Sequence, residues 1–137
     1  MKVIQCHELF VKAPDTLGVG ACVFARLVGL GANVLAFNGW AAKTEAQFVI
    51  VLEDELPNAC RSLEEMGCTV EQRTAITVDL SNQPGSLVAL LRTLADANID
   101  VLRSYATCTT STQTRVVLQT SDNQMARHVI STIPGRA

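Results

Sequence analysis

The sequence repeats one plan twice, and this repeat constrains the fold more than any other feature. Gly20 precedes Asn33 by thirteen positions. The same thirteen positions separate Gly85 from Asn98. Between Gly and Asn the apolar residues recur at helical spacing, in the second copy as Leu87, Leu90, Leu91, Leu94 and Ala95. An internal repeat of this length predicts two structurally similar units in one chain.

Each copy is predicted to run strand, helix, strand, strand, helix. In the second copy, Pro84 marks the start of the first helix, and Ser121 with Gln124 fits a capping box for the second. The strands of that copy are expected at residues 76–80, 99–106 and 112–119. The matching elements of the first copy are strands at 34–38 and 48–52, a helix ending at Gly67 and a final strand at 68–73.

This order, β-α-β-β-α-β, is typical of the ferredoxin-like unit. We therefore predict an α+β protein of two such units, residues 1–73 and 74–137, with antiparallel sheets and helices on one face. The last strand of the second unit is expected to be short or missing, because only residues 134–137 follow Ile133. Conversely, residues 1–11 look extended. They form one long strand, or their start pairs elsewhere, and the sequence leaves both open.

Composition excludes several classes of protein. A chain of 137 residues is too short for a Rossmann domain with a substrate domain or for a TIM barrel. The net charge of −2 and the pI near 5.6 argue against binding nucleic acid or an anionic membrane. No signal peptide is visible, and the apolar runs are short of the roughly 20 residues that span a bilayer. We expect a cytoplasmic protein.

The cysteines indicate neither a disulfide framework nor a zinc site. There are five, an odd number, and no pair has CxxC spacing. Cys6 adjoins His7, but no second pair completes four metal ligands. We expect reduced thiols, no metal and no cofactor. No local signature supports catalysis by a Cys-His pair.

One segment resembles a known family. Residues 78–87 read VDLSNQPGSL and residues 94–100 read LADANID, and together they are similar to the ACT domain family. Residues 76–133 match its pattern well, whereas residues 9–73 match in layout more than in letters. The whole chain thus resembles a stand-alone tandem ACT protein.

The resemblance implies that an amino acid binds where two ACT domains meet. The loop amides would hold its carboxylate, and backbone near Asn98 and Ile99 would hold its ammonium group. Gly85 permits close approach of the backbone, and a helix N-terminus favours a carboxylate. The candidate ligand-binding residues are Asn82, Gln83, Pro84, Gly85, Ser86, Leu87, Asn98, Ile99, Asp15, Thr16, Leu17, Gly18, Gly20, Asn33 and Val34. The plainer interpretation is that Pro84 and Gly85 only start a helix and Asn98 only makes a turn.

Two other binding functions have weak support. Gly18-Val19-Gly20 mimics a dinucleotide fingerprint, but position 23 is Val where the third glycine would stand. RNA-recognition domains need exposed aromatic residues on their central strands. Phe48 is the only aromatic residue in the segments 48–52 and 114–118.

We therefore expect a non-enzymatic regulatory protein that binds an amino acid or a similar small molecule. The alternative is an ACT-like assembly module that binds no ligand and docks on a partner enzyme or regulator. In both cases we expect a homodimer or a higher homo-oligomer, because an open strand edge and an apolar composition favour association.

Overall fold

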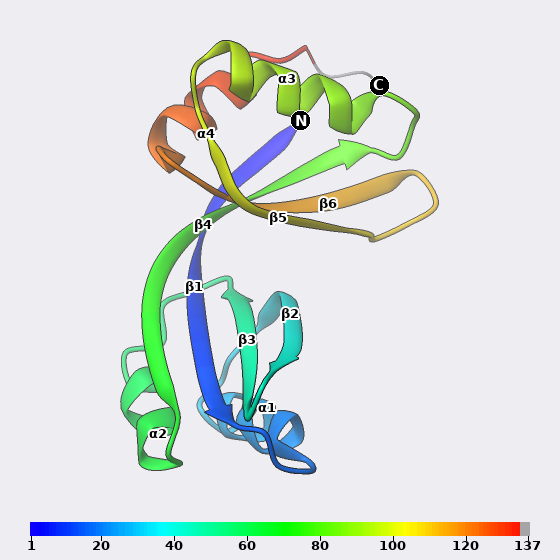
Figure 1. Ribbon diagram of the computed structural model, residues 1–137. Helices are drawn as coiled ribbons and strands as arrows, with labels where there is room; N and C mark the ends of the chain where they lie inside the picture. The colour runs from blue at the N-terminus through cyan, green and yellow to red at the C-terminus, as the bar shows by residue number, and fades with distance from the viewer. Residues whose placement is uncertain (135–137) are drawn as a thin grey trace. The chain divides into compact units, whose positions relative to one another are not determined.

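The computed structural model describes residues 1–134, with all of their side chains except that of Cys108. Within this range the protein is α+β, with six strands in one sheet and four helices (Figure 1). The elements are β1 (Lys2–Pro14), α1 (Val19–Gly29), β2 (Val34–Ala42), β3 (Glu45–Leu52), α2 (Ala59–Glu65), β4 (Thr69–Ser81), α3 (Ser86–Asp96), β5 (Val101–Cys108), β6 (Gln113–Thr120) and α4 (Asn123–Ser131).

The chain forms two compact units. One is Cys6–Arg73, and the other joins Met1–Gln5 to the chain from Thr74 onward. The strands are hydrogen-bonded in the order β2-β3-β1-β4-β6-β5. In this order, the first four strands contribute to the unit Cys6–Arg73, and the last four contribute to the other unit. β1 and β4 therefore contribute to both units. The expected repeat boundaries, 1–73 and 74–137, rest on similarity between the two halves of the sequence. They stay a prediction, because the compact units are defined by contacts in space.

The unit Cys6–Arg73 has one core between its helices and its strands. β3 pairs antiparallel with both β1 and β2. α1 contributes Val23 and Leu27 to the core, and α2 contributes Ala59 and Leu63, all fully buried. Because all four side chains belong to one cluster with strand residues such as Ile50, both helices pack on the same face of the strands.

The unit with Thr74 is built in the same way. β6 pairs antiparallel with β4 and β5, and α3 and α4 cover one face of these strands (Figure 1). Leu90 and Leu94 from α3 and Ala126 and Ile130 from α4 are fully buried. Each fully buried Leu or Ile stabilises the fold by about 1.5–3 kcal/mol relative to an exposed position.

The first residues of the chain complete this second unit. The extended run at the start is one long strand, β1, which neighbours β4. Met1 and Val3 pack against the core that contains Ile76 and Leu118. In residues 1–134 no strand follows α4. Residues 135–137, where a short last strand was expected, lie outside the described range. The first residues of β1 thus cover an edge of β4 that would otherwise be open.

Two local expectations differ from the structure. The strands expected at 68–73 and 76–80 are one continuous strand, β4, because no turn residue interrupts Arg73-Thr74-Ala75. The N-cap of α4 is Asp122 rather than Ser121, and its carboxylate accepts a hydrogen bond of 3.0 Å from the Met125 backbone N–H. An Asp N-cap satisfies a helix amide as well as Ser does.

The helices are short. Of those in residues 1–134, the longest are α1 and α3, with 11 residues each. None is long and apolar enough to cross a membrane.

Candidate functional site

The loop between β4 and α3 carries most of the predicted ligand-binding residues. Asn82, Gln83, Pro84 and Gly85 are exposed between the end of β4 and the first helical residue. Gly85 is the N-cap of α3, with φ 90°. This left-handed backbone favours glycine, and a Cβ added at Gly85 would meet no atom within 4 Å. The space around Gly85 is therefore open.

The tip of the β5–β6 hairpin anchors this loop. The Asn82 backbone N–H donates to the Thr112 carbonyl oxygen at 2.8 Å, and the Asn82 side-chain amide donates to the Ser111 carbonyl oxygen at 3.3 Å. Thr110 Oγ1 accepts from the backbone N–H of Thr112 at 3.2 Å and of Gln113 at 3.0 Å. The loop is thus held beside a hydroxyl-rich hairpin, which the sequence prediction did not include.

The start of α3 has backbone donors without a side-chain cap. Gly85 has no side chain, whereas Asp122 caps α4. The Ser86 N–H donates to the Gln83 carbonyl oxygen at 3.2 Å, and the Ala89 N–H closes the first helical bond on Gly85. The amides of residues 87 and 88 have no helical partner by geometry. A helix start of this kind favours an anionic group.

The loop between β1 and α1 has the same construction. Gly18 is the N-cap of α1 with φ 82°, and the Asp15 backbone N–H donates to the Thr44 carbonyl oxygen at 2.8 Å. Gly18, not Gly20, is therefore the counterpart of Gly85. Gly20 lies inside α1, where an added Cβ would be 3.6 Å from the Phe48 ring, so the prediction that placed Gly20 in the loop is wrong.

The turns that follow α1 and α3 also correspond. Asn98 has φ 57° and Gly31 has φ 83°, so each supplies the left-handed residue after its helix. Gly31, not Asn33, is therefore the counterpart of Asn98. The Asn33 side-chain amide instead donates to Glu53 Oε2 at 2.9 Å. Val34 is the first residue of β2.

Within one unit, the loop and the turn do not meet. The loop ends at Gly85 and the turn begins after Asp96, at opposite ends of α3. Eleven helical residues span about 16 Å, which exceeds the length of an amino acid. Ile99 is buried in the core, with 6% of its surface exposed. A single ligand therefore cannot contact both segments of the same unit.

The loop before α1 and the loop before α3 differ in charge at one equivalent position. Asp15 and Asn82 are equivalent, since each donates its backbone N–H to the neighbouring hairpin. An aspartate beside a helix start competes with a ligand carboxylate, whereas a neutral asparagine does not. The loop with Asn82 is therefore the better site for an anionic group.

The dinucleotide interpretation does not fit the sheet. A dinucleotide fingerprint needs two neighbouring parallel strands joined by a helix. Here α1 joins β1 to β2, and β3 lies between these strands and is antiparallel to both. Gly18 is consequently the N-cap of α1, and Gly20 lies within that helix.

The described cysteines are free thiols. Burial raises the pKa of Cys68. Burial also raises the pKa of Cys60, a hydrogen bond with Gln72 lowers it in part, and the charge of Glu64 raises it further. Among the residues of the described range, no group of three or more His, Cys, Asp and Glu side chains is placed to hold a metal ion.

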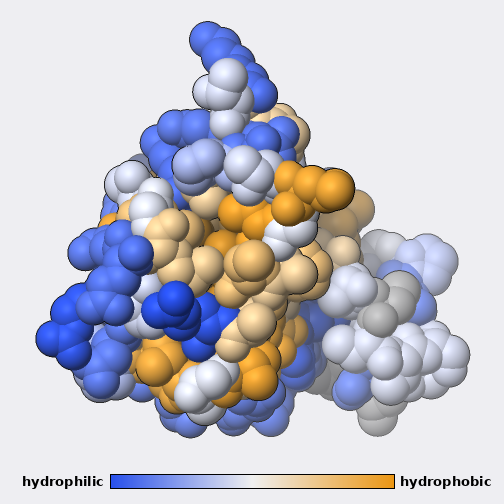
Figure 2. Space-filling view, turned by 90° about the horizontal axis from the view of Figure 1, so that it is seen from below, coloured by the Kyte–Doolittle hydropathy of each residue, from blue (hydrophilic) through white to orange (hydrophobic). Residues whose placement is uncertain are grey.

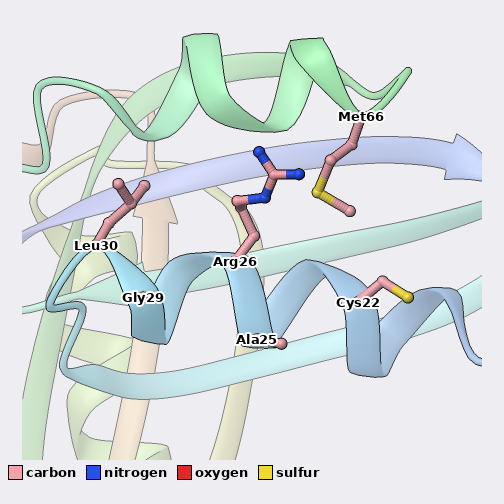
Figure 3. A pocket seen from close by; sticks show the side chains of 6 residues that line it. All are labelled: Cys22, Ala25, Arg26, Gly29, Leu30 and Met66. Carbon is pink, nitrogen blue, oxygen red and sulfur yellow. The ribbon is translucent and has the colours of Figure 1, made fainter.

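A shallow hollow of about 540 Å³ lies on α1 beside the end of α2. It is lined by Cys22, Ala25, Arg26, Gly29, Leu30 and Met66. Figure 3 shows the side chains of Arg26 and Met66 directed toward each other. Arg26 Nη1 donates to the Ser62 carbonyl oxygen at 3.4 Å and to its hydroxyl at 3.2 Å. Figure 2 views the molecule from below and shows apolar residues gathered near the middle, with hydrophilic residues around them.

Comparisons with solved structures show the fold. A protein from Bacteroides thetaiotaomicron matches with a TM-score of 0.81 at 16% identity, over 94% of this chain and 88% of that chain. The ligand-free regulatory subunit of aspartate kinase from Thermus thermophilus matches with 0.70 at 14%, over 96% of both chains. Escherichia coli aspartokinase III in complex with aspartate and ADP matches with 0.63 at 14%, over 93% of this chain and 31% of that chain.

No protein-family model and no curated protein matches the sequence. At these identities the shared property is the fold, an α+β arrangement of the ferredoxin-like kind that is also present in the regulatory subunit of Thermus thermophilus aspartate kinase.

Proposed function

We propose that this chain is a tandem ACT-type regulatory protein without catalytic activity. It binds an amino acid, or a similar small molecule with a carboxylate, at residues 82–87. The observation that carries the proposal is that α3 begins at Gly85 without a side-chain cap. The space around Gly85 is open, and hydrogen bonds to the β5–β6 hairpin hold the loop in place. Fold similarity to a regulatory subunit of aspartate kinase supports the regulatory role.

The geometry divides the ligand between two domains. Because α3 separates Gly85 from Asn98 by about 16 Å, the carboxylate binds at the loop of one domain and the ammonium group binds at the turn of another. In this proposal the two domains belong to two copies of the chain, so that the ligand stabilises their assembly.

The runner-up function is assembly without a ligand. Exposed apolar side chains on the helices favour it: Val28 is 66% exposed on α1 and Val88 is 54% exposed on α3. Under this alternative the protein still associates, but no amino acid changes its stability.

A thermal-shift screen against the twenty amino acids separates these functions. A ligand at one hundred times its Kd adds about 2.7 kcal/mol to the free energy of unfolding, which raises Tm by roughly 10 °C. A rise with one amino acid or a few supports the proposal. No rise with any of them at 10 mM overturns ligand binding and leaves the assembly module.

Three glycine variants then locate the site by calorimetry with the amino acid that gives the rise. Gly85, Gly18 and Gly67 all have φ between 82° and 90° and open space around them. Valine at each position costs about 1–2 kcal/mol of backbone strain. Gly67→Val, after α2, is the control for strain alone. We expect Gly85→Val to abolish binding and Gly67→Val to keep it. If only Gly18→Val abolishes binding, the ligand occupies the other loop.

A further inference from the structure

The geometry points to a contact between copies of this chain, in which the hollow on α1 receives the exposed apolar stripe of α3 from a second copy. The α3 stripe is Leu87, Val88 and Leu91. The inference concerns the assembly that the proposed function requires, and its test needs no amino acid.

The hollow suits a helix from outside the unit. Ala25 and Gly29 are four residues apart, so they lie on the same side of α1. Both are exposed, and a Cβ added at Gly29 would meet nothing within 4 Å. Small side chains let two helices approach closely, because the distance between helix axes depends on the side chains at the contact. Leu30 and Met66 provide apolar walls.

The α3 stripe supplies the protruding side chains. Leu87, Val88 and Leu91 are 45%, 54% and 37% exposed. At 100° per residue they cover one continuous arc of α3, beside the buried Leu90 and Leu94. A contiguous apolar stripe on a helix surface is typical of an interaction site.

Charge identifies a second copy as the occupant. The unit with the hollow carries nine acidic and five basic side chains, a net charge of −4. The unit with the α3 stripe carries four acidic and six basic side chains, a net charge of +2. Locally, Glu64 and Glu65 are exposed in the last turn of α2, and Arg92 is exposed next to Leu91. Arg26 also lines the hollow, but its guanidinium is directed to Ser62. The excess of acidic groups around the hollow therefore favours hollow against stripe over hollow against hollow.

Such a contact is heterologous, because it joins different surfaces of two identical chains. Two single variants and their mixture test it by sedimentation velocity. Gly29→Arg fills the hollow, and Val88→Arg interrupts the stripe. Both replacements raise helix propensity, so the helices are retained. Leu102→Arg on β5, where the leucine is 61% exposed, is the matched control at a strand.

We expect the wild-type chain to associate beyond 14.7 kDa as its concentration rises. Each helix variant should raise the dissociation constant at least tenfold, and Leu102→Arg should leave it within twofold. A mixture of Gly29→Arg and Val88→Arg should associate again, since one chain keeps the hollow and the other keeps the stripe.

Three outcomes overturn the inference: association that only Leu102→Arg weakens, a mixture that stays monomeric, or a wild-type chain that stays monomeric at every concentration. The result is distinguishable from a failure of ligand binding. Calorimetry of Gly85→Val reports on the loop, whereas Gly29→Arg alters no residue of the loop or the turn.

Discussion

Asp79 and Arg115 lie directly opposite each other on β4 and β6 and form an ion pair with two hydrogen bonds. Arg115 Nε donates to Asp79 Oδ1 at 2.9 Å, and Arg115 Nη2 donates to Oδ2 at 3.3 Å. The Arg115 side chain is 25% exposed and the Asp79 side chain is 20% exposed. The planar fork of arginine matches a carboxylate in a way that lysine does not.

Removing one partner should therefore destabilise the unit that contains β4. We expect Arg115→Ala to lower the free energy of unfolding by about 1–3 kcal/mol, because Asp79 is then left half-buried without this partner. Urea unfolding measures the change, with Arg127→Ala on the exposed side of α4 as the control. An Arg115→Lys variant as stable as wild type would contradict the importance of the two-bond geometry.

The charge of the loop should decide ligand affinity. Asn82→Asp is nearly isosteric but places a carboxylate where its counterpart, Asp15, already has one. We expect it to weaken binding of an amino acid at least tenfold, because like charges repel beside the start of α3. Calorimetry at low salt checks this, with Asp15→Asn as the matched control. Equal affinity for Asn82→Asp and wild type would mean that the carboxylate binds elsewhere.

Asn98 should be sensitive to β-branched residues. Its φ of 57° is tolerated by asparagine and glycine but strained for valine. We expect Asn98→Val to lower the free energy of unfolding by about 1–2 kcal/mol, and Asn98→Gly to leave it nearly unchanged. Ala97→Val provides the comparison, since Ala97 has an ordinary φ of −88°. Equal losses from the two valine variants would show that strain at Asn98 is absent.

The two left-handed residues also show why sequence comparison aligned the repeats wrongly. The matching interval from Gly20 to Asn33 paired identical letters, whereas the backbone requires a residue that accepts positive φ. Gly31 meets that requirement in one unit and Asn98 meets it in the other. The chemistry is equivalent although the letters differ, so counting Gly-to-Asn intervals shifted the first copy by two residues.

Alkaline pH should destabilise the unit Cys6–Arg73. Burial raises the pKa of Cys60 and of Cys68. A thiol whose pKa is higher in the folded state contributes stability that is present below its unfolded pKa, about 8.5, and is lost as pH rises through its folded pKa. We expect Tm to fall as pH rises above about 8.5. The double variant Cys60→Ala and Cys68→Ala should fall less steeply, whereas Cys22→Ser, at an exposed position, should keep the wild-type slope.

Deleting residues 1–5 should destabilise the unit that these residues form with the chain from Thr74 onward. The deletion removes no residue after Thr74. The deletion takes away the strand beside β4 and the packing of Met1 and Val3 on that core. We expect faster hydrogen exchange at Ile76 and Val78 and aggregation through the uncovered edge. Unchanged protection of these amides would show that the first five residues contribute nothing.

Local sequence patterns were sufficient to predict most helices and strands. They were insufficient to predict that β1 pairs with β4. Alternating apolar residues predicted the part of β4 at residues 76–80, and Pro84 with Gly85 predicted the start of α3, because both signals lie within a few neighbouring residues. The pairing of β1 depends on β4, which begins at Thr69. The hollow on α1 likewise depends on Met66, forty residues after Arg26. Contacts this distant in sequence leave no periodic signal.

The segment that closes the second unit leaves the ribosome well before the rest of that unit does. Residues 6–73 have all their partners once β4 has begun, so they are able to fold while the rest is being translated. Met1–Gln5, by contrast, stay unpaired until residues 74–81 emerge about seventy residues later. The unit formed by Met1–Gln5 and the chain from Thr74 onward must therefore close a loop of about seventy residues, so we expect its sheet to form more slowly than that of residues 6–73.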